Sequence, residues 1–172
     1  RSNGSIPMST WMFVVVGVLI LINALYVAAE FAIVGARASR VEHFARLGKH
    51  LAVAILPIVR DGARMDRYIA TCQIGITLSS LILGAFGQAT IGVALGALLV
   101  TLGMETIAAY ALAATIVLVV LTSTQVVLGE LIPKTVALQY PVGTAMYTYL
   151  PMRWSQIFFA PFIAVLNGSG NL

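Results

Sequence analysis

Charged residues are scarce in this sequence, and their scarcity indicates the class of protein. Only 9% of the 172 residues are Asp, Glu, Lys or Arg, whereas roughly a quarter are charged in soluble globular domains. Hydrophobic residues make up 60% of the chain, and its mean hydropathy is +0.98. These values exclude an ordinary soluble domain and indicate one compact helical unit embedded in a membrane.

Residues that build catalytic and soft-metal sites are almost absent. The chain has one cysteine, Cys72, and two histidines, His43 and His50. A single cysteine forms neither an internal disulfide nor a cysteine metal cluster, and both histidines fall in a basic stretch that we interpret as solvated. No glycine-rich phosphate loop and no Ser/His/Asp set at one depth is present. We therefore expect neither a zinc or copper centre nor an enzyme.

Basic residues are concentrated in one part of the chain. Seven of the ten Lys and Arg residues lie between Arg37 and Arg67. They flank apolar segments without interleaved aromatic residues, which argues against nucleic acid as a partner and favours membrane lipid at the cytoplasmic face. This predicts a multi-pass protein of the plasma membrane, with its N-terminus outside and its C-terminus in the cytoplasm.

The apolar segments predict an all-α membrane protein with three transmembrane helices. A span needs roughly 20 apolar residues, and we predict spans at about 9–35, 68–86 and 106–132. A short helix at the outer surface should follow the second span and end near Leu102. Residues 103–106 contain no Lys or Arg, as expected of an outside loop.

Two further segments are predicted to be juxtamembrane helices on the cytoplasmic side. The segment at about 37–59 is basic and amphipathic, and Pro57 with Asp61-Gly62 should end it. The segment at about 141–166 is rich in aromatic residues and broken by prolines, as is typical of the membrane interface. Residues 1–5 (RSNGS) are interpreted as a remnant of expression cloning, which leaves 6–172 as a single transmembrane domain.

Two carboxylates within the predicted spans need an explanation, because charged side chains are costly there. Glu30 either reaches toward the cytoplasmic end of its span or forms a polar wall with Asn23, seven residues earlier. Glu130 precedes Pro133, which deprives the Gly129 carbonyl of its helical hydrogen bond. Interrupted helices coordinate cations in this way in transporters. The alternative is a simple span end at Pro133, with Glu130 paired to Lys134.

The second span carries small and polar residues at helical spacing. Gln73, Thr77, Ser80 and Gly84 share one face, beside Cys72, Gly75 and Ser79. They serve either close helix packing or an oxygen-rich surface that faces Gly129. The candidate metal ligands are Asn23, Gly75, Thr77, Ser79, Ser80, Gly129 and Glu130, and a wider polar pathway comprises Glu30, Thr71, Gln73, Ser123 and Lys134. Such oxygen ligands suit Mg²⁺, Ca²⁺ or Na⁺ and do not by themselves rank these ions.

Three motifs, taken in order, resemble the membrane domain of the CorC/CNNM family, of the DUF21 type. They are YVAAEFAIV at 26–34, TCQIGITLSSL at 71–81 and VLGELIPK at 127–134, and the closing LNGSGNL at 166–172 is also similar. Gly-Glu-x-x-Pro-Lys is the most specific of these elements. Many relatives carry Asn near positions 76, 77 and 80, where this chain has Ile, Thr and Ser, so the resemblance leaves the ligands from this segment open.

The resemblance implies a magnesium transporter that exports Mg²⁺ in exchange for Na⁺ and acts as a homodimer. It also implies three membrane helices in each subunit and a following pair of cytoplasmic CBS domains, which this sequence does not include. The choice of Mg²⁺ as cargo and of Na⁺ as coupling ion depends on this resemblance. The alternative from another class is a membrane anchor and Mg²⁺ sensor that dimerises and regulates other transporters.

Overall fold

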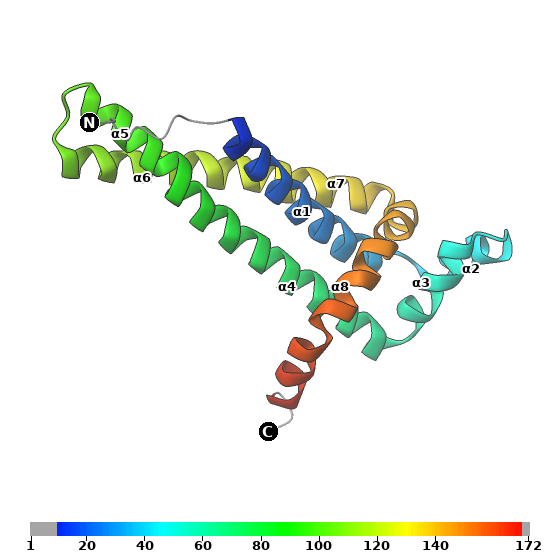
Figure 1. The fold of residues 1–172 in the computed structure, drawn as a ribbon. Coiled ribbons are helices and arrows are strands. Elements are labelled where there is room, and N and C mark those ends of the chain that lie inside the picture. Colours follow the sequence, from blue (N-terminus) through cyan, green and yellow to red (C-terminus); the bar gives the residue numbers. More distant parts are fainter. Residues whose placement is uncertain (1–9, 170–172) are drawn as a thin grey trace.

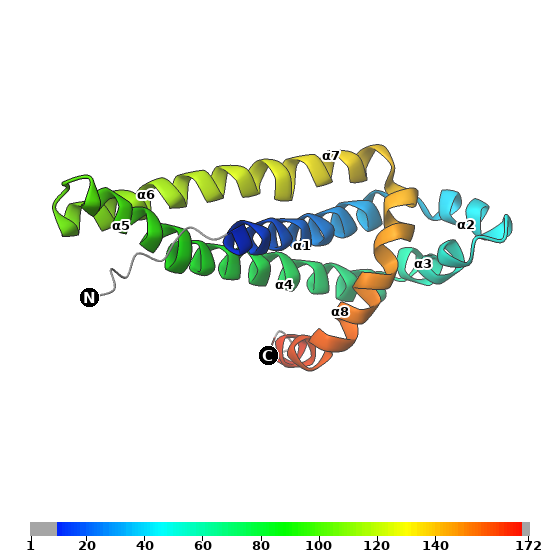
Figure 2. The same ribbon diagram turned by 45° about the horizontal axis from the view of Figure 1, so that its top comes forward.

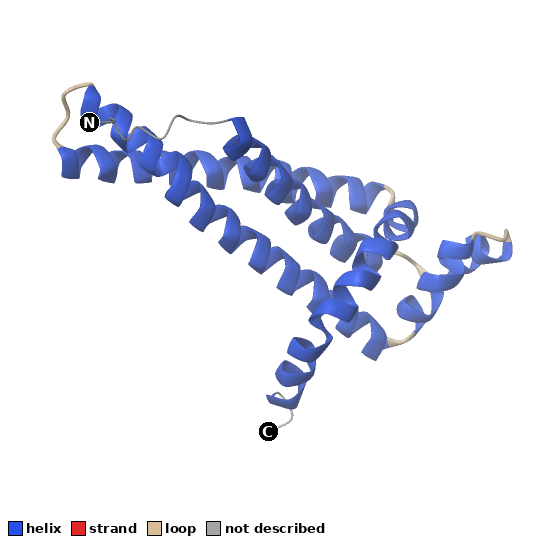
Figure 3. Cartoon of the chain, in the orientation of Figure 1, coloured by secondary structure: helices blue, strands red, loops and turns tan. Residues whose placement is uncertain are grey.

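The computed structural model describes residues 10–169 of the chain, and every regular element in that range is helical (Figures 1 and 3). Residues 1–5, interpreted above as a cloning remnant, lie outside the described residues. The helices are α1 (Thr10–Gly35), α2 (Ala38–Arg46), α3 (His50–Arg60), α4 (Gly62–Gly87), α5 (Val93–Thr101), α6 (Thr106–Thr124), α7 (Ile132–Gln139) and α8 (Pro141–Ser169), with π-helical segments η1 (Gln88–Gly92) and η2 (Gln125–Leu131).

Three continuous helices in the described range are long and apolar enough to span a membrane. They are α1, the helix Gly62–Thr101 formed by α4, η1 and α5, and the helix Thr106–Gln139 formed by α6, η2 and α7. The predicted fold class, an all-α membrane protein with three such helices, is confirmed. Figure 2 shows α1 between α4 on one side and α6 with α7 on the other.

The second long helix differs from its prediction at both ends. It begins at Gly62 rather than near Tyr68, because the Asp61 side chain accepts hydrogen bonds from the Ala63 and Arg64 amides. It also continues past Phe86 without a loop, through the π-helical segment η1. Two of its glycines, Gly87 and Gly96, permit close packing against α6. A Cβ on Gly96 would lie 2.3 Å from the ring of Tyr110 in α6.

The basic segment forms two helices, where the sequence predicted one. Helices α2 and α3 are separated at Gly48, whose φ of +78° is readily adopted only by glycine. Pro57 lies inside α3, and this helix ends three residues later at Arg60. Glu42 joins the two helices, because its carboxylate pairs with Arg46 and with Arg60 at 2.6 Å each.

The link between α2 and α3 should weaken in acid. The hydrogen bond from Arg46, aided by the charge of Arg60, lowers the pKa of Glu42 below its ordinary value of 4.5. A lowered folded-state pKa adds stability above the pKa of the unfolded chain, and that stability is lost as pH falls through the lowered value. We expect the difference in melting temperature between the wild type and Glu42→Gln to shrink from about pH 7 to about pH 3. A difference that stayed constant would contradict this.

Helix α8 crosses the end of the bundle where α1 ends and α4 begins (Figure 1). It continues through Pro151 and Pro161, in the segment where the sequence predicted a proline-broken interfacial helix. The Tyr26 hydroxyl of α1 and the Ser155 hydroxyl of α8 are hydrogen-bonded at 2.9 Å. Helices α2, α3 and α8 therefore gather at one end of the long helices, and the α5–α6 turn lies at the other.

Candidate cation site

Asn23 is the centre of a polar cluster inside the helix bundle. It lies near the middle of α1 and is fully buried. Its amide nitrogen donates to the Gly129 carbonyl of η2 at 3.2 Å. Its amide oxygen accepts from the Ser79 hydroxyl at 2.9 Å and from the Ser80 hydroxyl at 3.3 Å, both from α4. One side chain thus connects all three long helices.

The backbone around Pro133 affects the hydrogen bonding of the buried Gly129 carbonyl. Pro133 stands four residues after Gly129 and has no amide hydrogen to donate to it. The sequence predicted a kink at this place, but the chain passes through the π-helical segment η2 and continues into α7. The Gly129 carbonyl accepts a hydrogen bond from the Asn23 side-chain amide at 3.2 Å. A Cβ on Gly129 would lie 3.0 Å from the Asn23 amide nitrogen, so glycine keeps this approach open.

Gly75 allows α4 to approach α1 closely enough for this contact. A Cβ at position 75 would lie 2.4 Å from the ring of Tyr26. One turn later, Ser79 is buried, and its hydroxyl reaches both the Gly75 carbonyl, at 2.8 Å, and Asn23. Gly75 therefore contributes to the cluster by permitting the helices to pack, and its carbonyl lies at the edge of the cluster.

Glu130 lies beside this cluster and is half-buried. Within the described part of the chain it forms no ion pair or hydrogen bond, so the predicted alternative of a Glu130–Lys134 pair is not formed. Lys134 is exposed, and its ammonium lies over the Phe31 ring at 4.5 Å from the ring centre. The Glu130 carboxylate therefore has no protein partner among the described residues.

Gln125 is a member of the cluster that the sequence analysis missed. Its amide nitrogen donates to the Ser80 hydroxyl at 2.5 Å. Ser80 in turn bonds to Asn23, so the chain of hydrogen bonds runs from η2 to α4 to α1. One signal was available, because Gln125 is the only amide side chain between residues 106 and 132 and stands one turn before Gly129.

The structure does not bring every predicted residue to this cluster. Thr77 and Ser123 are exposed, and neither takes part in the hydrogen bonds of the Asn23 cluster. Thr77 is two residues from both Gly75 and Ser79, which places it about 200° around the helix from each. The buried face of α4 carries Thr71, Cys72, Gly75 and Ser79, and this face lies beside the one that the sequence analysis favoured.

The remaining predicted pathway residues lie nearer the basic end of the bundle. The Gln73 amide donates to the Glu30 carboxylate at 3.4 Å, which joins α4 to α1. The buried Thr71 hydroxyl donates to the carbonyl of Arg67 at 2.8 Å, as expected of a hydroxyl bonded to its own helix. Together with the Asn23 cluster, Glu30 and Gln73 form a second polar contact between the same two helices.

The donor set of the Asn23 cluster determines which ions it could hold. It offers amide, hydroxyl and carbonyl oxygens with one adjacent carboxylate, Glu130. In the described range, no group of three or more His, Cys, Asp or Glu residues is placed to hold a metal ion. Hard cations such as Mg²⁺ accept neutral oxygen ligands and retain several waters, so this set can replace part of a hydration shell without binding irreversibly.

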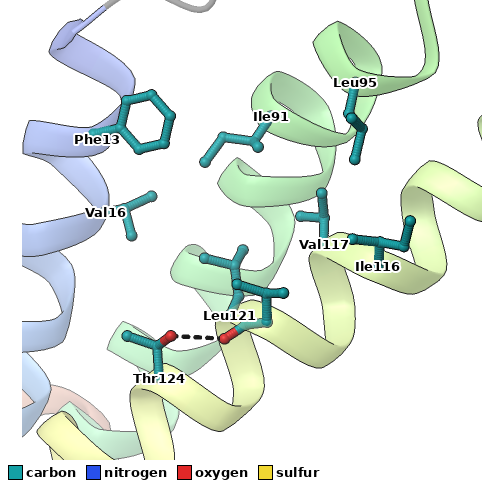
Figure 4. A pocket seen from close by; sticks show the side chains of 9 residues that line it. Phe13, Val16, Ile91, Leu95, Ile116, Val117, Leu121 and Thr124 are labelled. Atoms are coloured by element: carbon teal, nitrogen blue, oxygen red, sulfur yellow. Dashed lines mark hydrogen bonds between the residues drawn. The ribbon is translucent and has the colours of Figure 1, made fainter. Parts of the chain in front are cut away.

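A second feature of the bundle, an apolar cavity, is unsuited to a cation. It measures about 380 Å³ and lies between α1, η1, α5 and α6 (Figure 4). Its walls include Phe13, Ile91, Leu95 and Ile116. The one hydroxyl that faces it, from Thr124, donates to the carbonyl of Val120 at 2.8 Å. The polar groups needed for an ion are therefore at the Asn23 cluster and not in this cavity.

The cluster itself should stabilise the fold. Asn23→Ala would leave the Gly129 carbonyl and the hydroxyls of Ser79 and Ser80 without their shared partner. Such a loss costs about 1–3 kcal/mol in buried sites, and about 0.6 kcal/mol on average between membrane helices. We expect a lower melting temperature in detergent than for Thr115→Ala, whose hydroxyl bonds only its own helix. Equal melting temperatures for the two variants would contradict the connecting role of Asn23.

The chain is similar to known membrane-domain sequences along most of its length. The family model of the cyclin M transmembrane N-terminal domain (CNNM) matches residues 14–172. UPF0053 protein YhdP of Bacillus subtilis is 35% identical over 159 residues, which cover 92% of this chain and 35% of YhdP. UPF0053 protein YrkA of the same organism is 34% identical over 164 residues, 95% of this chain and 37% of YrkA. UPF0053 protein sll0260 of Synechocystis sp. is 30% identical over 152 residues, 88% of this chain and 33% of that protein. The chain spans about a third of the length of these curated relatives.

Proposed function

Since the chain belongs to the cyclin M transmembrane N-terminal domain family, we propose that it is the membrane domain of a magnesium transporter. Its cation site comprises Asn23, Ser79, Ser80, the Gly129 carbonyl and the Glu130 carboxylate. The observation that carries this assignment is the fully buried Asn23 amide, which bonds to both other long helices. Glu130 directly follows Gly129 in the chain and has no ion pair among the described residues. Ionisable residues such as Glu130 are rare in membrane spans and often mark ion pathways, which supports this assignment.

Transport would use the coupling that the cluster creates between helices. Mg²⁺ holds its water tightly and prefers near-octahedral oxygen ligands. The neutral oxygens replace part of that water, and Glu130 supplies the single negative charge. Because the same side chains hold α1, α4 and η2 together, binding of the ion changes the contacts between all three helices. This gives the ion a means to favour one arrangement of the helices over another.

We further propose that Na⁺ drives the export of Mg²⁺ and that the protein works as a homodimer in the plasma membrane. The basic end with α2, α3 and α8 faces the cytoplasm, in agreement with the excess of Lys and Arg in cytoplasmic loops. A pair of CBS domains in the full-length protein would follow α8 on that side. These assignments extend the family resemblance beyond this chain, which spans about a third of the length of its curated relatives.

The test is a flux measurement with the purified protein in liposomes. We expect Mg²⁺ flux that increases when an oppositely directed Na⁺ gradient is imposed across the membrane, and that stops when Na⁺ is omitted from both sides. Mg²⁺ flux that does not depend on Na⁺ would contradict the proposed Na⁺ coupling but not the proposed Mg²⁺ site. An absence of flux from a folded protein that still binds Mg²⁺ would instead favour the membrane anchor and sensor.

A further inference from the structure

Three arginines converge at the end of the bundle where α3, the start of α4 and α8 meet (Figure 1). They surround a pocket of about 490 Å³, into which α4 contributes Arg64 and Arg67 and α8 contributes Arg153. Helix α3 supplies an apolar wall with Pro57 and Ile58. The pocket lies outside the Asn23 cluster, and neither the transport proposal nor the family comparison uses it.

The charge of the pocket is left largely unbalanced. Asp61 pairs with Arg64, with 3.2 Å between Oδ2 and Nε. Arg67 and Arg153 form no ion pair within the described residues, and no carboxylate lines the pocket. Guanidinium groups present forked donors that match the oxygens of a phosphate group. The pocket therefore favours an anion that carries phosphate.

The surface beside the pocket indicates where that phosphate comes from. Trp154 and Phe158 follow Arg153 on α8, and each is 75% exposed. Exposed aromatic side chains are typical of the level of the lipid headgroups. Arg64 and Arg67 occupy the first turns of a helix long enough to span the membrane, so their guanidinium groups lie where that helix leaves the hydrocarbon. A soluble phosphate compound without an apolar part would not contact this exposed aromatic surface, whereas a phospholipid would.

We propose that this pocket binds the phosphate headgroup of an anionic phospholipid. Arg67 and Arg153 bind the phosphate oxygens, and the acyl chains lie along the exposed apolar side of α8. Basic pockets between helices at the membrane surface bind lipid headgroups in this manner. Bound there, one lipid connects the start of α4 to α8 and so holds together the elements of the basic end.

Quenching of Trp154 by brominated lipids tests the proposal directly. The chain has two tryptophans, so a Trp11→Phe background leaves Trp154 as the only one. In phosphatidylcholine vesicles that contain a minor fraction of brominated lipid, we expect brominated phosphatidylglycerol to quench Trp154 more strongly than brominated phosphatidylcholine. In Arg67→Gln/Arg153→Gln that preference should fall roughly tenfold or more, because each basic residue near an anionic lipid surface contributes appreciably to attraction.

A matched control separates the pocket from general surface charge. The variant Arg46→Gln/Lys49→Gln also removes two positive charges, but near α2. Its preference for brominated phosphatidylglycerol should equal that of the Trp11→Phe protein. Equal quenching by the two brominated lipids in the parent, or an undiminished preference in the pocket variant, would overturn the proposal. An equal loss in the control would also overturn it. If excess inorganic phosphate abolished the preference, the pocket would belong to a soluble phosphate compound and not to a lipid. Equal helicity by circular dichroism would show that the variants are folded.

Discussion

Glu130→Gln is expected to reduce Mg²⁺ flux through the protein to the level of empty liposomes. Among the described residues, Glu130 supplies the carboxylate of the proposed site, and glutamine keeps its size while it removes the charge. Unit charges about 4 Å apart interact by about 4 kcal/mol at an effective dielectric constant near 20, and the attraction to a divalent ion is larger. Loss of this interaction should remove Mg²⁺ binding while the fold is retained, because Glu130 makes no hydrogen bond or ion pair within the described residues.

The measurement is flux in proteoliposomes together with Mg²⁺ binding by calorimetry. Glu105→Gln is the matched control, because it removes one carboxylate at the start of α6. Its remaining side-chain oxygen can still accept a hydrogen bond from the Ile107 or Ala108 amide. The control should transport and bind like the wild type. Wild-type Mg²⁺ affinity in Glu130→Gln would refute the site, whatever its flux.

Gly75→Ala is expected to push α1 and α4 apart. It should lower the stability of the fold and reduce Mg²⁺ transport. The added Cβ would lie 2.4 Å from the Tyr26 ring, far inside van der Waals contact. The ring cannot easily turn away, because its hydroxyl is bonded to Ser155 of α8. Overpacking of this kind typically costs about 1–3 kcal/mol. It also moves Ser79 away from Asn23, so Mg²⁺ affinity should fall along with the melting temperature.

Gly84→Ala is the control for this effect, because it makes the same change in the same helix. Nothing lies within 4 Å of a Cβ at position 84, and alanine is favoured over glycine in a helix by about 1 kcal/mol. The control should therefore melt at the same temperature as the wild type or higher. Similar melting temperatures for the two variants would show that the close approach at Gly75 has no energetic consequence.

The polar cluster around Asn23 could be predicted from the sequence in part. Asn23 and Glu130 stood out because a polar side chain in an apolar span is rare and costly. The Gly129 carbonyl followed from the position of Pro133, four residues later. Gln125 was missed, because an amide near a span end has several ordinary uses. Thr77 was grouped with the cluster but lies on an exposed face, because helical spacing alone does not say which face of a helix is buried.

The sequence by itself determined the class of protein, the three long apolar helices and the basic end. Each of these depends on composition or on local hydropathy, and both can be read from short segments of the sequence. Only the tertiary structure decided that the face of α4 with Gly75 and Ser79 meets α1, and that Gly48 divides the basic segment in two. It also decided that Asn23, Ser80, Gln125 and Gly129 form one hydrogen-bonded cluster. The physical reason is that a helix apolar on every side can bury any face, and the choice depends on which small residues let neighbouring helices approach.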